Sequence, residues 1–327
     1  MKHQVKVLII RFSSIGDIVL TTPVIRCLKN QLEGDVEIHY VTKKSYASLL
    51  TNNPHISKVH TIEKSTNEII KELQSENFDY IVDLHKNLRS ARLKKKLPAF
   101  SFSFEKLNWE KWLLVNLKIN RLPEIHIVDR YLKAVKALGI KNDGLGLDYF
   151  LPDGIEKEIT IPETHQNGFI ALVLGANHAT KRIPKVKLIE LIESSNKAFI
   201  LIGGKEDQEL GVALEKMYPD QIYNAAGETN LNQSAYLIKQ AQIVISPDTG
   251  MMHIAAAFQK EIISVWGNTV PEFGMYPYYK KGNEFNSTIV ENKNIKCRPC
   301  SKIGFNKCPK GHFKCMMELD LKIGARL

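Results

Sequence analysis

The stretch VKVLIIRFSSIGDIVLTTPVIRCLKNQL, residues 5–32, runs from an apolar segment through a loop of small residues into a second apolar segment. VKVLII, from Val5 to Ile10, is typical of a strand buried in a parallel sheet. IVLTTPVIRCLKNQL, from Ile18 to Leu32, places its apolar residues at helical spacing. A buried strand, a short loop and a helix in this order predict the beginning of a parallel α/β sheet.

The same alternation of strands and helices continues along the chain. Residues 141–168 interrupt it, because they are rich in Gly, Pro, Asp and Glu and have no strong apolar period. Before this interruption we expect further strands at 36–42, 58–62 and 78–84 and a helix at 67–77. After it we expect strands at 168–176, 197–204, 221–227, 242–250 and 260–267.

This repeated pattern predicts an α/β protein of two doubly wound, Rossmann-like domains with parallel sheets that face each other. We place the first domain at residues 1–160 and the second at residues 161–327. Ligands of such folds bind in the cleft outside the carboxyl ends of the strands. The loops that follow the strands are therefore the places to look for functional side chains.

The composition limits the class of protein. The 327 residues include 45 Lys and Arg against 35 Asp and Glu, which gives a net charge of +10. Such a charge attracts nucleic acids, anionic membranes and phosphorylated ligands alike, but the sequence contains no helix-turn-helix, RRM or basic-repeat pattern. No apolar stretch reaches membrane-spanning length, and the N-terminal apolar run ends at Arg11, unlike a signal peptide. We therefore expect a cytoplasmic protein.

The loop RFSSIGDIVLTTP joins the first strand to the first helix and is the first candidate site. Ser13, Ser14 and Gly16 are small, so a substrate can approach the backbone closely. The helix that follows offers unpaired N–H groups to an anion, and Asp17 lies near its start. The plain alternative is that Asp17 only caps the helix. The loop lacks the glycines and lysine of dinucleotide-binding and NTP-binding loops, which disfavours both of those classes.

The segment ISPDTGMMHIAAAF is the second candidate. Asp248, Thr249 and Gly250 form a tight turn between a strand and a helix, and backbone N–H groups with a hydroxyl can hold a diphosphate there. His253 follows one turn into the helix. The alternative is a structural turn with a capped helix and a buried histidine.

The segment LGANHATKRIP is the third candidate. Lys181 and Arg182 follow the first strand of the second half, and two cations at that place could neutralise a departing diphosphate. The alternative is a solvated pair of charges.

Taken together and in this order, the motifs RFSSIGDIVLTTPVIRCLK, GANHATKRIP and SPDTGMMHIAAA resemble glycosyltransferase family nine, the ADP-heptose:lipopolysaccharide heptosyltransferases. The resemblance implies a GT-B fold, with an acceptor-binding first domain and an ADP-heptose-binding second domain. It also implies a general base at Asp17, a contact with the donor phosphates at Lys181, and a donor-binding turn that is completed by a histidine. The matching residues of that turn and histidine are Asp248, Thr249, Gly250 and His253.

Two further segments carry a weaker resemblance to the same family. IGGKED places Gly203, Gly204 and Asp207 on the nucleotide side, and DLHKNLRS places Asp83, Arg89 and Ser90 on the acceptor side. The chain departs from the family pattern in two places. Ile183 stands where family members often have Trp, and residues 94–118 do not align with any segment of the family pattern.

The implied chemistry is an inverting transfer of heptose from an ADP-sugar donor to a lipopolysaccharide-precursor acceptor. It needs no catalytic metal, because cations and N–H groups stabilise the leaving diphosphate and no D-x-D motif is evident. The alternatives are a transferase of the same family with another nucleotide sugar or acceptor, a sugar-nucleotide hydrolase or epimerase, and a basic nucleic-acid- or glycan-binding protein.

Four of the five cysteines lie close together in CRPCSKIGFNKCPKGHFKC. The first pair has knuckle spacing, and four thiolates could hold a structural zinc ion. Reduced packing thiols and disulfides are the alternatives. The four residues are Cys297, Cys300, Cys308 and Cys315.

A basic segment follows the fourth expected strand, and it is either a solvated helix face or an anion-binding surface. Its ligands would be acceptor phosphates, acceptor carboxylates or the anionic inner leaflet. Trp109 and Trp112 lie nearby in the sequence and could reach a membrane interface. We therefore expect a peripheral association with the inner face of the cytoplasmic membrane. The acceptor-side cations are Lys86, Arg89, Arg92 and Lys94 to Lys96.

Overall fold

The structure is a computed structural model that describes residues 3–283 and 286–321. The chain forms two compact units. The first unit comprises Met1–Lys106 and Ile125–Phe150, and the second unit comprises Leu107–Glu124 and Leu151–Leu327. This division differs from the expected boundary at residue 160 in two ways: the main crossing falls at residue 150, and a segment of the first half belongs to the second unit.

The exchanged segment carries helix α5 (Asn108–Leu117). Leu114 on this helix packs in one apolar cluster with Val270 and Phe273 of the second unit. Lys118, directly after the helix, donates hydrogen bonds from Nζ to the carbonyl oxygens of Cys297 and Pro299, at 3.0 and 2.6 Å. Because these partners lie far along the chain, composition alone could not assign the segment to the second unit.

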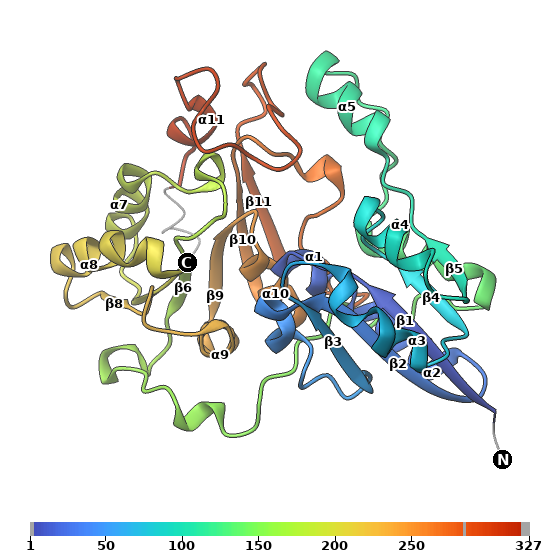
Figure 1. The fold of residues 1–327 in the computed structure, drawn as a ribbon. Coiled ribbons are helices and arrows are strands. Elements are labelled where there is room, and N and C mark those ends of the chain that lie inside the picture. The colour runs from blue at the N-terminus through green and yellow to red at the C-terminus, as the bar shows by residue number, and fades with distance from the viewer. Residues whose placement is uncertain (1–2, 284–285, 322–327) are drawn as a thin grey trace. The chain divides into compact units, whose positions relative to one another are not determined.

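The first unit is built on a five-stranded parallel sheet with the strand order β3-β2-β1-β4-β5 (Figure 1). Val7, Leu8, Ile9 and Ile10 on the central strand are all fully buried. Successive side chains of a strand point to opposite faces, so both faces of the sheet are covered, as a doubly wound fold requires. The strands are β1 (Gln4–Ile10), β2 (Asp35–Lys43), β3 (Lys58–Ile62), β4 (Tyr80–Asp83) and β5 (Phe100–Ser103).

Helices connect these strands. Pro23 stands in the first turn of α2, where its missing N–H group has no partner to lose. The α-helices of the first unit are α1 (Ile15–Val19), α2 (Thr22–Gln31), α3 (Ile70–Ser75), α4 (Leu88–Lys94) and α6 (Ile127–Ala134).

The second unit has a six-stranded parallel sheet with the order β11-β10-β9-β6-β7-β8, which is the doubly wound order. Its strands are β6 (Ile170–Val173), β7 (Phe199–Ile202), β8 (Ile222–Asn224), β9 (Ile243–Pro247), β10 (Glu261–Trp266) and β11 (Ser287–Glu291). Besides α5, its α-helices are α7 (Lys185–Glu193), α8 (Gln208–Met217), α9 (Leu231–Gln240), α10 (Gly250–Ala257) and α11 (Lys314–Met317).

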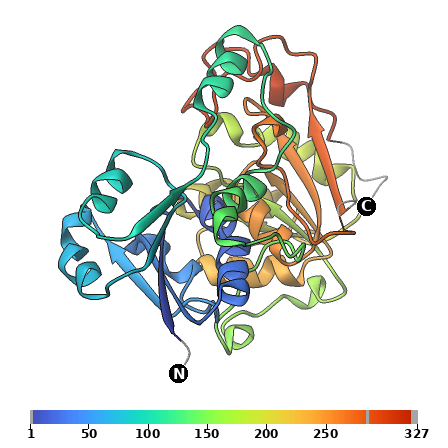
Figure 2. The same ribbon diagram turned by 90° about the vertical axis from the view of Figure 1, so that its right-hand side faces the viewer.

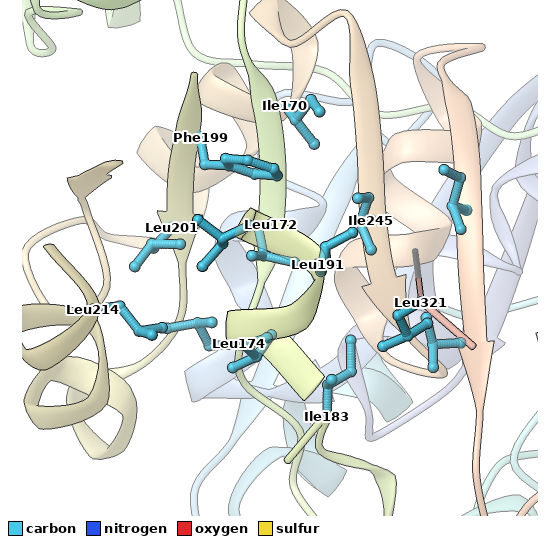
Figure 3. Close-up of a cluster of buried hydrophobic side chains, with 14 of the residues drawn as sticks. Ile170, Leu172, Leu174, Ile183, Leu191, Phe199, Leu201, Leu214, Ile245 and Leu321 are labelled. Atoms are coloured by element: carbon cyan, nitrogen blue, oxygen red, sulfur yellow. The ribbon is translucent and has the colours of Figure 1, made fainter. Parts of the chain in front are cut away.

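The core of the second unit lies between the sheet and its helices (Figure 3). Leu172 and Leu201 from adjacent strands meet Leu191 of α7 and Leu214 of α8 there. Leu321, close to the end of the described chain, packs into the same cluster. The C-terminal segment is therefore part of the domain core. None of the helices in the described part of the chain has the length and hydropathy of a membrane span.

Candidate active site

The candidate residues gather where the strand order of each sheet reverses. In the first sheet β1 lies between β2 and β4, so the loops after β1 and β4 begin side by side. In the second sheet β6 lies between β7 and β9, so the loops after β6 and β9 begin side by side. Ligands of doubly wound sheets bind at such switch points. The expected placement at the carboxyl ends of the strands is confirmed within each unit.

Asp17 lies in the first turn of α1, and its carboxylate has two sets of partners. Oδ2 accepts hydrogen bonds from Ser14 Oγ at 2.9 Å and from Ser14 N at 3.3 Å. Oδ1 pairs with Arg11 Nη2 at 2.6 Å. The carboxylate therefore does cap the loop, but its side chain is still 23% exposed, so a small ligand can reach it.

Arg11 determines the charge state of this carboxylate. Burial raises the pKa of the Asp17 carboxyl, but the adjacent Arg11 guanidinium and the Ser14 hydrogen bonds outweigh burial and lower the pKa below its ordinary value. Arg11 is itself held by hydrogen bonds to the carbonyl oxygens of Ser13 and Leu84, at 2.8 and 2.6 Å. Asp17 is therefore ionised at neutral pH and fixed in position.

The loop after β4 is organised by Asp83. Its Oδ1 accepts hydrogen bonds from the backbone of His85 and Lys86, and its Oδ2 accepts one from Ser90 Oγ at 2.8 Å. Lys94 pairs with the same Oδ2 at 3.1 Å. Ser90 is fully buried within this network. We therefore assign Ser90 a positioning role instead of the acceptor contact that the sequence suggested.

A basic hollow of about 840 Å³ lies beside this loop in the first unit. Five of its lining residues are cations and none is acidic. Arg89 also lies over the Phe12 ring, at 5.8 Å from the ring centre. Lys86 does not line the hollow, in contrast to Arg89 and Arg92. The lining cations are Lys64, Arg89, Arg92, Lys95 and Lys96.

His85 is a candidate site residue that sequence reasoning did not single out. Its Nδ1 is buried and has no hydrogen-bond partner among the described residues. Burial and the nearby positive charges of Arg11 and Lys106 lower its pKa to about 4, so the ring is neutral at pH 7. The available signal was its position in DLHKNLRS, directly after a strand at the switch point.

In the second unit, Lys181 and Asp248 are brought together. Lys181 Nζ lies 2.6 Å from Asp248 Oδ2 and 3.2 Å from the Asp248 carbonyl oxygen. Thr269 Oγ1 donates to the same Oδ2 at 2.9 Å. The two motifs therefore form one site, although they lie far apart in the sequence.

Helix α10 begins at Gly250, and its N-terminal N–H groups donate no hydrogen bond to the side chain of Thr249, the N-cap residue. Thr249 Oγ1 instead lies 3.2 Å from Ser246 Oγ. Gly250 is the first residue of the helix, and His253 is buried one turn further. An uncapped helix start beside a lysine suits an anionic ligand.

Arg182, Asp207, Gly203 and Gly204 form a second network beside this one. Arg182 Nη1 pairs with Asp207 Oδ1 at 3.1 Å, and Asp207 Oδ2 accepts a hydrogen bond from Gly204 N at 2.9 Å. A Cβ atom at Gly203 would lie 2.8 Å from the Asp207 Cβ, so only glycine fits there. Asp207 is buried, and this network sets the position of the loops around the site.

The cysteine-rich segment, residues 297–315, forms hydrogen bonds with the loops that carry Lys181 and Thr269. Thr180, next to Lys181, exchanges hydrogen bonds with the backbone of Phe305: its Oγ1 accepts from Phe305 N at 2.8 Å, and its backbone N donates to Phe305 O at 3.1 Å. Arg298 donates to the carbonyl oxygens of Gly267 and Thr269. Asn268, between these two residues, is buried, and both polar atoms of its side chain lack a partner among the described residues. Asn268 is a second candidate site residue that the motifs did not identify.

All five cysteines are free thiols, so the structure does not have the disulfides considered from the sequence. Burial raises the pKa of Cys300 to about 12 and that of Cys315 to about 11. Over residues 3–283 and 286–321, one group of metal-ligating side chains has its ligand atoms within 4.8 Å of one another, and it contains no cysteine. Zinc at the four cysteines stays a prediction that these side-chain positions do not favour.

That group is His39, His60 and Glu76 in the first unit. His39 Nδ1 and His60 Nε2 lie 3.0 Å apart, and His60 Nδ1 lies 2.9 Å from Glu72 Oε1. Lys58 Nζ pairs with Glu76 at 2.8 Å, and Lys6 pairs with Glu76 as well. The charges of the group are already balanced by these lysines, so it serves as a polar network within the unit.

Two doubly wound units, with an ionised carboxylate after β1 of one and a lysine-aspartate pair at a helix start of the other, define the class of GT-B glycosyltransferases. The family model described as glycosyltransferase family 9 (heptosyltransferase) matches residues 66–305. Because this match covers more than half of the chain, the protein belongs to glycosyltransferase family 9. It is a glycosyltransferase.

Relatives and solved structures agree with this assignment. The chain is 25% identical to lipopolysaccharide heptosyltransferase 1 of Campylobacter coli, over 81% of this chain and 84% of that one. It is 25% identical to lipooligosaccharide heptosyltransferase 2 of Haemophilus influenzae, over 91% and 92%. The fold matches the Veillonella parvula glycosyl transferase family 9 structure with a TM-score of 0.77 at 19% identity, covering 100% of this chain and 97% of that one. It also matches E. coli heptosyltransferase WaaC with ADP, with a TM-score of 0.67 at 20% identity, over 87% and 92%.

Proposed function

We propose that this protein transfers a heptose from ADP-heptose to a lipopolysaccharide inner-core acceptor, with inversion at the anomeric carbon. The observation that carries the proposal is the Lys181–Asp248 pair at the uncapped start of α10 in a member of this family. The heptosyltransferase names of the relatives and the ADP bound to the E. coli structure support the choice of donor.

The second unit takes the donor in this proposal. The Lys181 ammonium and the N–H groups of Gly250 and its neighbours hold the diphosphate, because the lysine charge and the positive end of the helix dipole both lie at the start of α10. Asp248 accepts hydrogen bonds from sugar hydroxyls, and the unpaired amide of Asn268 supplies a further donor and acceptor. Arg182, Gly203, Gly204 and Asp207 hold the surrounding loops in place.

The first unit takes the acceptor. Its basic hollow, lined by Arg89, Arg92 and three lysines, fits the phosphates and carboxylates of a lipopolysaccharide precursor. The small residues Ser13, Ser14 and Gly16 let the acceptor hydroxyl approach Asp17. The neutral ring of His85 can hydrogen-bond a second acceptor group through its unpaired Nδ1.

The proposed transfer step uses these residues as follows. The acceptor oxygen attacks the anomeric carbon and forms the new C–O bond, while the bond from that carbon to the ADP oxygen breaks on the opposite face. The acceptor proton passes to Asp17. Because Arg11 weakens Asp17 as a base, the proton moves late, when the attacking oxygen has already become acidic. Lys181 stabilises the charge that develops on the diphosphate. The step uses no metal ion.

We further propose that the protein is cytoplasmic and works at the inner face of the cytoplasmic membrane, where a lipid-linked acceptor would be found, and that it has no nucleic-acid partner. Thermal-shift titrations with ADP, GDP, UDP and CMP test the donor class, and ADP should stabilise the protein most. Product analysis with ADP-heptose, in the presence and absence of a lipopolysaccharide-precursor acceptor, tests the reaction. Equal stabilisation by all four nucleotides, or release of free heptose without transfer, would contradict the proposal.

A further inference from the structure

Helix α5 exposes a pair of stacked tryptophans. The rings of Trp109 and Trp112 lie 5.2 Å apart and 6° from parallel. Their exposed fractions are 64% and 47%, which is unusual for the largest apolar side chain. Leu117 and Ile119, at the end of the helix, are also exposed. The helix therefore presents an apolar face that nothing in the described chain covers.

The opposite face of α5 fixes the helix to the second unit. Leu113 and Leu114 are buried, and Leu114 packs against Val270 and Phe273. Residues three apart share one face of a helix, so Trp109 and Trp112 project together, on the side opposite to Leu114. The tryptophans are thus held on a rigid support.

A cationic segment lies at the same end of the second unit (Figures 1 and 2). Between Glu291 and Glu318 the chain has no acidic residue but seven Lys and Arg residues. Lys118, at the end of α5, donates hydrogen bonds to the backbone of this segment at Cys297 and Pro299. Four of its lysines are exposed and form no ion pair with the acidic residues that the structure describes: Lys296, Lys302, Lys307 and Lys310.

Apolar side chains are interleaved with these cations. Ile303 and Phe305 are exposed, at 55% and 38%, between Lys302 and Lys307. Exposed apolar groups among unpaired lysines, next to a tryptophan pair, have the chemistry of a surface that enters the headgroup layer of a bilayer.

We propose that α5 and residues 292–317 form a docking surface for an anionic lipid bilayer. The tryptophan rings insert at the level of the headgroups, and the unpaired lysines attract the lipid phosphates. This inference deepens the proposed function, because it rests on a membrane-borne acceptor and names the surface that meets the membrane. It is separate from the basic hollow of the first unit, which is assigned to the acceptor itself.

Sedimentation with vesicles of phosphatidylcholine and phosphatidylglycerol tests the surface directly. Trp109→Ser combined with Trp112→Ser should lower vesicle partitioning about tenfold, and Lys302→Glu combined with Lys307→Glu should lower it about a hundredfold. Vesicles of phosphatidylcholine alone should bind weakly. Tryptophan emission should shift to the blue on vesicle binding, because Trp266 is already buried and only the exposed pair changes its environment.

Matched substitutions on other exposed faces of the second unit are the controls. Val186→Ser with Met217→Ser removes apolar groups of similar exposure, and Lys185→Glu with Lys216→Glu reverses exposed charges on α7 and α8. Both control variants should bind vesicles as the unaltered protein does.

Equal vesicle binding by the tryptophan variant and the unaltered protein would overturn the inference. Binding to duplex DNA that is tighter than binding to vesicles and depends on the same lysines would also overturn it. ADP stabilisation and transfer to a delipidated acceptor should be unchanged in all of these variants. Failure of those two assays in the unaltered protein would count against the proposed function and not against the docking surface.

Discussion

The Nζ atom of Lys181 lies 2.6 Å from Oδ2 of Asp248, and the same ammonium group donates to the Asp248 backbone carbonyl. The two residues follow β6 and β9, which are neighbours in the sheet although they are distant in the sequence. This pair joins the lysine proposed to hold the donor phosphates to the turn proposed to hold the donor sugar. A change at either residue should therefore alter how strongly the other one binds the donor.

Lys181→Ala should weaken ADP binding about tenfold to a hundredfold, because the charge that faces the diphosphate is lost and Asp248 becomes an uncompensated anion beside it. Calorimetry measures the effect. Lys185→Ala, four residues further along the chain and exposed, is the matched control. Adding Asp248→Asn should recover part of the loss, since the two residues are coupled. Additive losses would show that the pair does not act as a unit.

Asp17→Asn should lower the rate of heptosyl transfer about 10²- to 10⁴-fold and leave ADP affinity unchanged. The amide keeps the size of the carboxylate but cannot take the acceptor proton. Steady-state kinetics and calorimetry separate the two quantities. Because Arg11 loses its ionic partner, the melting temperature should be measured alongside. Turnover close to that of the unaltered protein would exclude Asp17 as the base.

Thr180→Val should lower the free energy of unfolding by about 1–3 kcal/mol, because the Phe305 N–H group loses its acceptor in a buried place. Since Thr180 precedes Lys181, ADP affinity should fall as well, although Thr180 is not assigned a ligand contact. Urea unfolding and calorimetry measure the two effects. Thr180→Ser, which keeps the hydroxyl, should restore both, and an affinity loss that persists in the serine variant would argue against the hydrogen bond as the cause.

The free energy of unfolding should rise as the pH increases from about 4 to about 6.5. Burial and the charges of Arg11 and Lys106 lower the pKa of His85 to about 4, whereas an unfolded histidine titrates near 6.5. Between these values the unfolded chain binds a proton that the folded protein does not, so stability increases with pH. Burial lowers the pKa values of His39 and His60 in the same direction.

Urea unfolding at a series of pH values tests this dependence. His85→Asn should flatten the profile between about pH 4 and 6.5. An unaltered slope in the His85 variant would contradict the assigned shift.

Arg92→Glu combined with Lys96→Glu should raise the KM for a phosphorylated acceptor about tenfold or more, because the basic hollow loses two cations and gains two anions. ADP affinity should not change, since both residues belong to the first unit. Lys71→Glu, on α3 and outside the hollow, is the control. Kinetics with acceptors that differ only in their phosphates would show whether the basic hollow binds these phosphates.

Much of the fold could be predicted from local patterns. The strand expected at residues 58–62 coincides with β3, and the strand from Val5 begins one residue earlier, at Gln4. Central parallel strands are apolar on both faces, which makes them visible in a single sequence. The edge strands β5 and β11 were not expected, because their side chains are half-buried or exposed and carry no apolar run.

The site was predictable to the level of loops but not of partners. The rule that ligands lie at the carboxyl ends of strands selected the loops that carry Lys181 and Asp248, and the structure then brings these two residues together. The local sequence did not indicate that Arg11 forms an ion pair with Asp17, or that Ser90 is buried and donates a hydrogen bond to Asp83. The unpaired side chains of His85 and Asn268 were also missed, because burial without a partner depends on residues that are distant in the sequence.

The exchange of residues 107–124 between the units has a consequence for biosynthesis. When the first 150 residues have left the ribosome, α5 has been made, but Val270 and Phe273, on which it packs, have not. Until the second half emerges, the segment that carries Trp109 and Trp112 lacks the residues on which it packs. No single scission of the chain yields either unit whole, so an isolated first unit needs a linker between residues 106 and 125, and an isolated second unit needs one between residues 124 and 151.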